Sequence, residues 1–401
     1  MKYIVVVLAG AADHPTEELG GKTPFEAAKV PHLNFFAKSG KVGTAKLVAD
    51  RLPLSSDVSL FDLLGYDASK LYTGRGPLEA ANLELTVEDK EVAFCMNFIT
   101  EAAGMLADPT AGNISTKEAK ALVNFLNKKV ASDFVRFFPG TGHRHIAILK
   151  DAHGFEALSA KTHAPEDVTG QKIEDRLPSG PGDELMRKLM YDAKLLLQDH
   201  EINQVRVDLG ENPANMIWLW GQGRRPVLKP FRELFDLSGG AMVAAREFAK
   251  GLGRLAGLTV MEVKAENEEP AAFYERITKV AIEAMEEKDF VCLYLHTPDE
   301  AARTGDVKEK ISALEGIDFF VLSKIRKYIE RSKDARLLVT PGHATLWKMK
   351  AMIRDAVPFC VTGKNIMADE IERFSEVAAK TSELRFGKST ELMPFFITKA
   401  S

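Results

Sequence analysis

The chain has 401 residues, which is too long for one ordinary hydrophobic core and favours two domains. Hydrophobic residues make up 45% and charged residues 27%, and the formal net charge is −4 at pH 7. This charge excludes a broad basic surface for nucleic acid or an anionic membrane. No stretch reaches the roughly 18 consecutive apolar residues that a membrane span needs.

The first part of the chain predicts one buried strand followed by short helices. Tyr3 to Leu8 is a continuous apolar run, which is typical of a strand buried on both faces of a parallel sheet. No cleavage motif follows it, so a signal peptide is not expected. Helices are predicted over Thr23–Ala28, His32–Ser39 and Asp57–Leu64. Ser55 and Ser56 directly precede the last helix and suit its N-cap or first turn.

The rest of the chain divides into two patterns. The middle predicts strands and helices of mixed order, over Glu91–Thr100, Thr116–Val130, His145–Leu149, Glu184–Gln198 and Asn215–Trp220. From about residue 240, helices and strands alternate. Helices are predicted over Ala241–Leu255, Ala271–Lys288 and Lys308–Ser332. The strands between and after them are predicted over Thr259–Val263, Phe290–His296 and Arg336–Thr340. This alternation predicts an α/β fold with a doubly wound parallel sheet. Residues 1–82 and 236–401 would form that domain, and 83–235 a smaller lobe inserted into it.

The three cysteines, Cys95, Cys292 and Cys360, lie far apart and belong to no paired motif. An odd number of scattered thiols is not expected to form a disulfide framework or a zinc site. The sequence therefore predicts buried free thiols and a cytoplasmic location.

Polar residues follow three of the predicted strands. They lie in Pro53-Leu-Ser-Ser-Asp57, in Leu293-Tyr-Leu-His-Thr-Pro-Asp-Glu300 and in Leu338-Val-Thr-Pro-Gly-His343. The carboxyl ends of parallel strands are where open α/β sheets build their binding sites. Taken alone, a serine beside a helix start is more often a cap than a nucleophile.

Several longer motifs occur in a specific order along the chain. They are SDV and LGYD within 56–67, YTGR and PLEA within 72–80, NPANMIWLWGQG at 212–223, GLGRLAG at 251–257, PDEA at 298–301 and VPF at 357–359. In this order they resemble the archaeal-type cofactor-independent phosphoglycerate mutase family, essentially from end to end. The resemblance implies an alkaline-phosphatase-like domain interrupted by a substrate-binding lobe. It also implies conversion of 3-phosphoglycerate to 2-phosphoglycerate through a phosphoserine.

The resemblance places Ser56 at the position of the nucleophile and implies two divalent metals, Mn²⁺ or Mg²⁺. Such ions lower the pKa of the serine hydroxyl and offset the charge of the transferred phosphoryl group. Among the family's other metal-ligand positions, Asp299 and His343 are retained, whereas four are replaced, by Ala9, Arg303, Gly342 and Met352. Hard cations prefer oxygen ligands, and neither alanine nor glycine can supply one from its side chain. No bound metal pair is therefore expected.

Arg303 introduces a fixed positive charge where the family has a histidine. If the segment after Pro298 is helical, Asp299 and Arg303 are four residues apart on one face and can pair. Our hypothesis is that the guanidinium replaces the metal charge and makes Asp299 a structural partner. The alternative is a solvated surface pair that is unrelated to the site.

In the inserted segment, Cys95 and Asn113 replace an arginine and a histidine that help the family to hold its substrate. Arg144 remains, and Arg224 and Arg225 form a basic turn that could bind an anion by charge-assisted hydrogen bonds. The alternative for the latter two is ordinary surface basicity.

These observations favour a diverged, catalytically impaired member of the family that is retained for binding or assembly. One alternative is a working mutase, or a related phosphotransferase resembling a homoserine kinase, with a rearranged site. Another is a non-catalytic anion sensor. The expected ligand is a phosphorylated small acid or another anion, neither nucleic acid nor a membrane is expected, and a homo-oligomer stays open.

Overall fold

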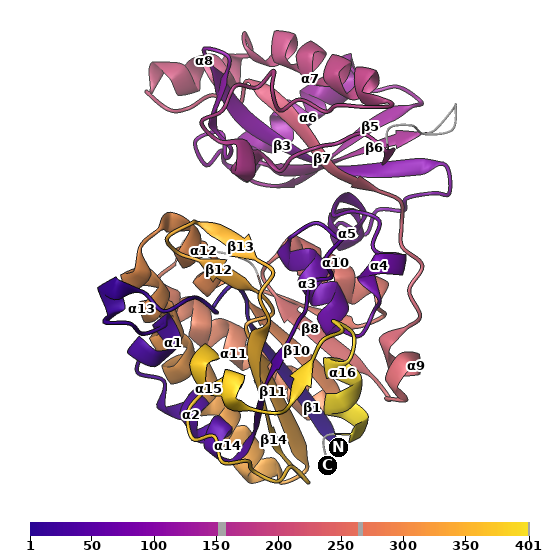
Figure 1. Cartoon of the computed structure of the whole chain (residues 1–401). Helices are drawn as coiled ribbons and strands as arrows, with labels where there is room; N and C mark the ends of the chain where they lie inside the picture. The colour runs from indigo at the N-terminus through magenta and orange to yellow at the C-terminus, as the bar shows by residue number, and fades with distance from the viewer. Residues whose placement is uncertain (151–157, 264–267, 400–401) are drawn as a thin grey trace. The chain divides into compact units, whose positions relative to one another are not determined.

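The computed structural model describes residues 1–150, 158–263 and 268–399 (Figure 1). It divides the chain into two compact units, one of Met1–Tyr72 and Val227–Ser401 and the other of Thr73–Pro226. Both crossings lie earlier in the chain than the predicted bounds of 83 and 236. At the first crossing the reason is helix α5 (Gly76–Asn82), which packs directly on strand β3 (Glu91–Ala102). A Cβ at Gly76 would lie 2.3 Å from the carbonyl oxygen of Ala93.

The described part of the first unit contains an eight-stranded sheet in the order β15-β2-β14-β11-β1-β10-β8-β9. Its strands are β1 (Lys2–Leu8), β2 (Gly40–Ala45), β8 (Gly240–Ala244), β9 (Thr259–Glu262), β10 (Phe290–Leu295), β11 (Ala335–Thr340), β14 (Val357–Gly363) and β15 (Arg385–Phe386). The pairings are parallel except for those of β14, which is antiparallel to β11 and β2. The predicted first strand lies between β10 and β11 and is buried on both faces.

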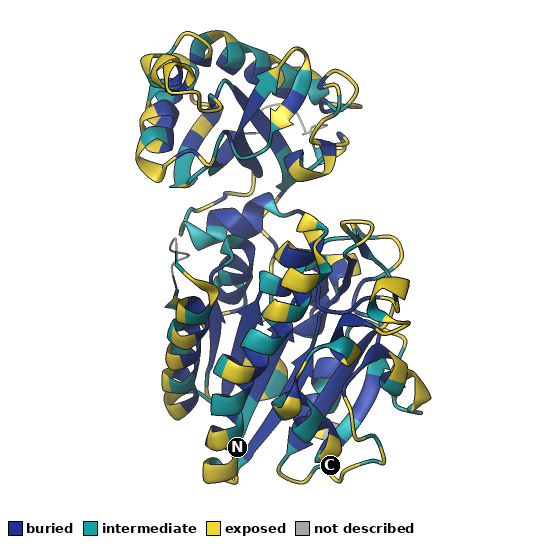
Figure 2. Cartoon of the chain, turned by 90° about the vertical axis from the view of Figure 1, so that its left-hand side faces the viewer, coloured by how far each residue is buried: buried dark blue, intermediate teal, exposed yellow. Residues whose placement is uncertain are grey.

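Helices cover both faces of this sheet (Figures 1 and 2). Strand β8 shows the arrangement. Its Val243 packs in the same apolar cluster as Ile277 of α11 (Pro270–Glu287). Its neighbour Met242 points to the other face, where it lies against Gly253 of α10 (Glu247–Leu255). The predicted fold class, a doubly wound and mostly parallel sheet, is therefore confirmed.

The remaining helices of this unit include α1 (Pro24–Ala27), α2 (Pro31–Lys38), α3 (Ser56–Leu63), α4 (Ala68–Leu71), α9 (Phe231–Phe235), α12 (Thr297–Thr304), α13 (Val307–Ile317), α14 (Ser323–Ser332), α15 (Glu376–Thr381) and α16 (Leu392–Pro394). The segment predicted as one helix over Lys308–Ser332 is divided by a π-helical turn, Asp318–Leu322, between α13 and α14. No helix among the described residues is long and apolar enough to cross a membrane.

The prediction of a helix over Ala241–Leu255 is wrong for its first part. Strand β8 occupies Gly240–Ala244, and helix α10 begins only at Glu247. The run Ala241-Met-Val-Ala-Ala245 is apolar at every position, so its periodicity does not distinguish a buried strand from a buried helix. Pairing with β10 and β9 in the sheet decides for the strand.

The second unit is a smaller antiparallel sheet with two long helices on one face and the short helix α5 on the other. Long strand β3 pairs with β6 (Arg144–Lys150) on one side and with β4 (Met105–Asp108) and β7 (Met216–Gly223) on the other, and β5 (Val135–Thr141) continues the sheet beyond β6. Helices α6 (Thr116–Lys129) and α7 (Asp183–Leu197) bury Leu122 and Met190 in the same cluster as Phe94 and Phe98 of β3. Helix α8 (Glu201–Asp208) follows α7. The predicted inserted α/β lobe is thus present as a compact unit.

The turn between α13 and α14 caps a helix that is distant in sequence. The carboxylate of Asp318 accepts hydrogen bonds from the backbone N–H groups of His32 (3.1 Å) and Leu33 (2.8 Å), in the first turn of α2. Val30, at the N-cap position of α2, provides no side-chain cap of its own. Asp318 therefore accepts the hydrogen bonds that a serine or aspartate at the N-cap position accepts in other helices.

We predict that Asp318→Ala lowers the free energy of unfolding of the first unit by about 1–3 kcal/mol, because two buried N–H groups lose their acceptor. Hydrogen exchange of the peptide that covers residues 31–38 should become faster. Asp318→Asn keeps one acceptor oxygen and should cost less. Unchanged exchange in the alanine variant would contradict this role of Asp318.

Candidate functional site

The carboxyl ends of three adjacent strands in the first unit bring together two of the predicted site segments, those after β10 and β11, and the residues that follow β1. The third predicted segment, Pro53–Asp57, does not directly follow a strand, because β2 ends at Ala45. Strands β10, β1 and β11 are neighbours in parallel register, so the residues that follow them meet at one edge of the sheet. The N–H of Ala9, directly after β1, donates to the carbonyl oxygen of Leu295 at the end of β10. Ala11 and Ala344 form a β-bridge that joins the segments after β1 and β11.

Asp299, in the first turn of α12, has hydrogen-bond donors on both carboxylate oxygens. Its Oδ1 accepts from Thr345 Oγ1 at 2.5 Å, and its Oδ2 accepts from Arg303 Nε at 3.1 Å. The Nδ1 of His343 lies 3.2 Å from the same threonine hydroxyl. Burial alone would raise the pKa of Asp299, but the neighbouring His343 and Arg303 and the hydrogen bond from Thr345 lower this pKa to about 2. Because burial lowers the pKa of His343 itself to about 4, the fixed positive charge beside Asp299 at neutral pH is that of Arg303. Asp299 is therefore an ionised carboxylate whose charge is already compensated.

The four replaced positions lie around this carboxylate, and they do not fit a pair of divalent metals. Ala9 is completely buried, and Met352 lies directly opposite Thr345 in the β-ladder between Ala344–Leu346 (β12) and Ala351–Ile353 (β13). Gly342 has no side chain, and Arg303 supplies a cation in place of a ligand. In the part of the chain that the structure describes, no group of three or more His, Cys, Asp or Glu side chains could hold a metal ion.

Two glycines allow the backbone to approach the site closely. Gly10 has φ +69°, and a Cβ there would lie 2.6 Å from both the Cβ and the Oδ1 of Asp299. Gly342 has φ +72°, and a Cβ there would lie 3.1 Å from a methyl group of Val7. Glycine adopts this backbone region more readily than any residue with a side chain, and any Cβ at 342 would also press on Val7.

Ser56 is the first residue of α3, and it is half-buried. Ser55, rather than Ser56, occupies the N-cap position, although its hydroxyl makes no capping bond. One turn into the helix, Ser59 donates to the carbonyl oxygen of Gly342 at 2.7 Å, which fixes α3 against the loop that carries His343. The Ser56 side chain thus lies at the positive end of a helix dipole, a position that favours an anion.

A buried cluster of charged residues, which the sequence analysis missed, adjoins the site. Lys310 on α13 is fully buried, and its Nζ donates to Asp13 Oδ2 (2.7 Å), to the carbonyl oxygen of Thr345 (2.7 Å) and to that of Ala12 (3.2 Å). The N–H of Asp13 donates to Glu376 Oε1 at 2.8 Å. One signal was available: Lys310 lies on the buried face of its helix with Leu314 and Ile317.

In the second unit, the predicted anion-binding arginines differ in their surroundings. Arg144, at the start of β6, is half-buried, whereas Arg224 and Arg225 are exposed in the segment that follows β7. Thr73 donates to the backbone carbonyl of Arg224 at 2.5 Å, so this segment is held by its main chain. Cys95 is completely buried in the sheet.

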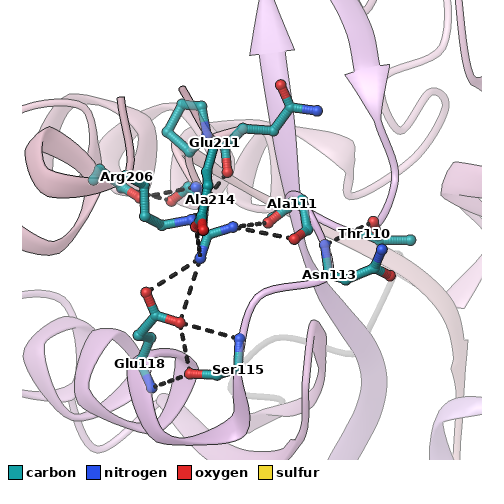
Figure 3. A network of polar contacts seen from close by, with 12 residues as sticks. Thr110, Ala111, Asn113, Ser115, Glu118, Arg206, Glu211 and Ala214 are labelled. Carbon is teal, nitrogen blue, oxygen red and sulfur yellow. Dashed lines mark hydrogen bonds and ion pairs between the residues drawn. The ribbon is translucent and has the colours of Figure 1, made fainter. Parts of the chain in front are cut away.

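The loop that carries Asn113 is held by a buried arginine, Arg206 of α8 (Figure 3). Its guanidinium donates to the carbonyl oxygens of Ala111 (2.9 Å), Gly112 (3.2 Å) and Asn212 (3.0 Å). It also pairs with the carboxylates of Glu118 (3.1 Å) and Glu211 (3.0 Å). Sequence reasoning did not find Arg206, because its partners come from three separate segments.

Comparison with known proteins agrees with this arrangement. The chain is 38% identical to a 2,3-bisphosphoglycerate-independent phosphoglycerate mutase of Methanosarcina barkeri over 400 residues, which covers 99% of both chains. It is 35% identical to such a mutase of Methanothermobacter thermautotrophicus over 402 residues, covering 100% of this chain and 98% of the relative. The family profile described as 2,3-bisphosphoglycerate-independent phosphoglycerate mutase matches residues 37–203. This chain belongs to that family.

Two solved structures are similar to the whole of this family member. A cofactor-independent phosphoglycerate mutase of Thermoplasma acidophilum has a TM-score of 0.62 and 27% sequence identity, and the match covers 100% of both chains. A protein of Pyrococcus horikoshii has a TM-score of 0.78 at 23% identity, covering 100% of this chain and 97% of the other. The second likeness shows the fold alone. Together with the sequence relatives, these comparisons confirm the family that the motifs predict.

The buried charge cluster generates a pH prediction. Burial raises the pKa of Glu376 from its ordinary value of 4.5 to about 7. Because the folded-state pKa is the higher one, the contribution of Glu376 to stability is fully present below about pH 4.5 and is lost as the pH rises through about 7. The slope should approach about 1.4 kcal/mol per pH unit within this window.

Glu376→Gln should remove this slope, because glutamine keeps the acceptor for the N–H of Asp13 and does not ionise. The measurement is urea unfolding of the first unit between pH 5 and pH 8, followed through the fluorescence of Trp347 in a Trp218→Phe, Trp220→Phe background. A glutamine variant with the same pH dependence as the parent would show that another group titrates.

The Arg206 network generates a stability prediction for the second unit. Arg206→Ala leaves three carbonyl groups and two carboxylates without this donor, and we expect a loss of about 2 kcal/mol or more. Arg187→Ala is a suitable control, because Arg187 is partly exposed and has fewer partners than Arg206: one backbone carbonyl, that of Pro178, and one carboxylate, that of Asp183, in an ion pair that should contribute at most about 1 kcal/mol. Urea unfolding followed through Trp218 and Trp220 in a Trp347→Phe background measures both. Equal losses would contradict the role of the network.

Proposed function

We propose that this chain is a member of the phosphoglycerate mutase family that has lost the two-metal phosphoryl transfer and has kept the ability to bind an anionic small molecule. The observation that carries the proposal is the state of Asp299. Both of its oxygens accept hydrogen bonds from the protein itself, one from Thr345 and one from Arg303. A carboxylate whose two oxygens both accept hydrogen bonds in this way is a poor ligand for a divalent cation.

Protein cations take over the charge balance of the site in this proposal. Arg303 neutralises Asp299, and Lys310 neutralises Asp13 and donates to the same residue, Thr345, that bonds to Asp299. These contacts favour a structural role for Arg303 over a solvated surface pair, because its partner Asp299 is only 14% exposed. Transfer of a phosphoryl group through Ser56 would need mobile or metal-borne positive charge at the hydroxyl, and both protein cations are committed elsewhere.

The ligand of the second unit is proposed to be a small phosphorylated acid or a similar anion. Arg144, Arg224 and Arg225 support this, because no side-chain hydrogen bond or ion pair is found for them within residues 1–150, 158–263 and 268–399. An arginine that has no protein acceptor is available for charge-assisted binding of a carboxylate or phosphate.

A working phosphotransferase is the second candidate, either a mutase or an enzyme resembling a homoserine kinase. Ser56 favours it, because the serine is accessible at the N-terminus of α3 and Ser59 fixes that helix against the site. In that case the cation needed for transfer would have to come from a rearrangement of Arg303 or from ligands outside the residues described.

We expect the purified protein to bind no stoichiometric Mn²⁺ and to show no mutase turnover above that of Ser56→Ala in an enolase-coupled assay with added Mn²⁺. Arg303→His provides a matched test, because it returns one imidazole and frees one oxygen of Asp299. Inductively coupled plasma analysis and the coupled assay should be run on all three proteins. Ser56-dependent turnover in the unmodified chain would reject the proposal in favour of the enzyme.

The cytoplasmic location and the assembly state belong to the proposal as well. Cys95, Cys292 and Cys360 are all buried free thiols, which supports a reducing compartment. A homo-oligomer would be recognised by light scattering coupled to size-exclusion chromatography.

A further inference from the structure

Asn97, in the middle of β3, is a buried asparagine that uses only one end of its side-chain amide. The residue is 2% exposed. Its Oδ1 accepts a hydrogen bond from Trp220 Nε1 at 3.0 Å. Its Nδ2 is buried, and no partner for it is found in the part of the chain that the structure describes. An amide NH₂ carries two donors, so both of them are unused.

The orientation of this amide is determined by chemistry, because the indole N–H can only donate and the atom that faces it must be the amide oxygen. The indole itself is held from the other side by Arg75, whose guanidinium lies 5.4 Å from the centre of the Trp220 ring. Rotating the amide would bring two donors together, so Nδ2 cannot use Trp220 to satisfy itself.

Other asparagines in the same unit show what a purely structural amide does here. Asn127 donates to and accepts from the backbone of Phe137. Asn203 donates to two carbonyl groups and accepts from the N–H of Ala214. Asn215 makes the same two-sided contact with Glu101. Each of these three uses both ends of its amide, whereas Asn97 leaves its donor end free.

Arg144 is the residue directly opposite Asn97 on the neighbouring strand β6. Residues that face each other across an antiparallel pair project to the same face of the sheet, with Cβ atoms about 4.5–5.5 Å apart. Arg144 is half-buried and has no hydrogen-bond or ion-pair partner among the described residues. A neutral NH₂ donor and a guanidinium, neither with an acceptor among the described residues, therefore belong to adjacent residues on one face of the sheet. Cys95, two residues along the same face, adds no further charge.

We infer that Asn97 and Arg144 form a subsite for one oxyanion group, a carboxylate or a phosphate of a small acid. The guanidinium supplies the charge, and Asn97 Nδ2 donates to one oxygen of the anion. This inference deepens the proposed function, since it rests on binding of an anion by the second unit and assigns a residue to that binding.

The test is Asn97→Asp in the full chain. Aspartate is isosteric and keeps the acceptor for Trp220, so the structural bond survives while both donors are lost and a repelling charge is added. We expect at least a tenfold weaker affinity than the parent by isothermal titration calorimetry. Asn127→Asp is the matched control, because its amide contacts only the backbone of Phe137, and its affinity should equal that of the parent.

Three ligands separate the two sources of the oxyanion: glycerate presents a carboxylate, glycerol 3-phosphate presents a phosphate, and 3-phosphoglycerate presents both. The subsite binds the group whose affinity falls in Asn97→Asp. If the parent binds a ligand, and the affinity for it is lost in Arg144→Ala but unchanged in Asn97→Asp, then Asn97 takes no part in binding and the inference is wrong. The proposed anion binding would still stand. If the parent binds none of the three, the proposed anion binding itself fails.

A measurement on the unmodified protein covers the case in which Asn97→Asp does not fold. The side-chain NH₂ resonances of Asn97 should shift during titration with 3-phosphoglycerate, while those of Asn203 and Asn215 should not. Unchanged Asn97 resonances at saturating ligand would overturn the inference.

Discussion

Asp299 holds a negative charge almost out of contact with water, and the structure around it is arranged so that this charge never lacks a partner. Burial by itself would raise the pKa of the carboxylate, but the nearby His343, the guanidinium of Arg303 and the hydroxyl of Thr345 hold this pKa at about 2. The chain itself supplies the compensating groups, from α12 and β12.

A second buried ion pair next to the site, that of Lys310 and Asp13, is compensated in the same way. Lys310 is a fully buried ammonium whose three donors all meet oxygen atoms, those of Asp13, Ala12 and Thr345. Because Thr345 accepts from Lys310 through its carbonyl and donates to Asp299 through its hydroxyl, the two ion pairs share one residue. A mutation in either pair should therefore affect the other, and their energetic effects should not be additive.

In the second unit, some buried donors have acceptors in the protein and others have none among the residues that the structure describes. Its buried Arg206 is saturated by carbonyl and carboxylate groups and serves to hold a loop, whereas Arg144 and the amide of Asn97 have donors to spare. Buried donors without acceptors are rare in proteins and costly to maintain. This contrast within one small sheet is the basis on which we propose Arg144 and Asn97, and not Arg206, as ligand-binding positions.

The sequence by itself determined the family, the α/β alternation and the position of Ser56 at a helix start, and it predicted the replacement of metal ligands at Ala9, Arg303, Gly342 and Met352. These follow from residue identity and local spacing, which act within a few residues of each other. The sequence did not determine strand β8, whose uniformly apolar residues suit either a helix or a strand. It also did not reveal Asp318 as the cap of α2, the burial of Lys310 against Asp13, or the unused amide of Asn97. Only the tertiary structure decided these, because each depends on which distant groups, if any, meet a given polar atom once the strands are paired.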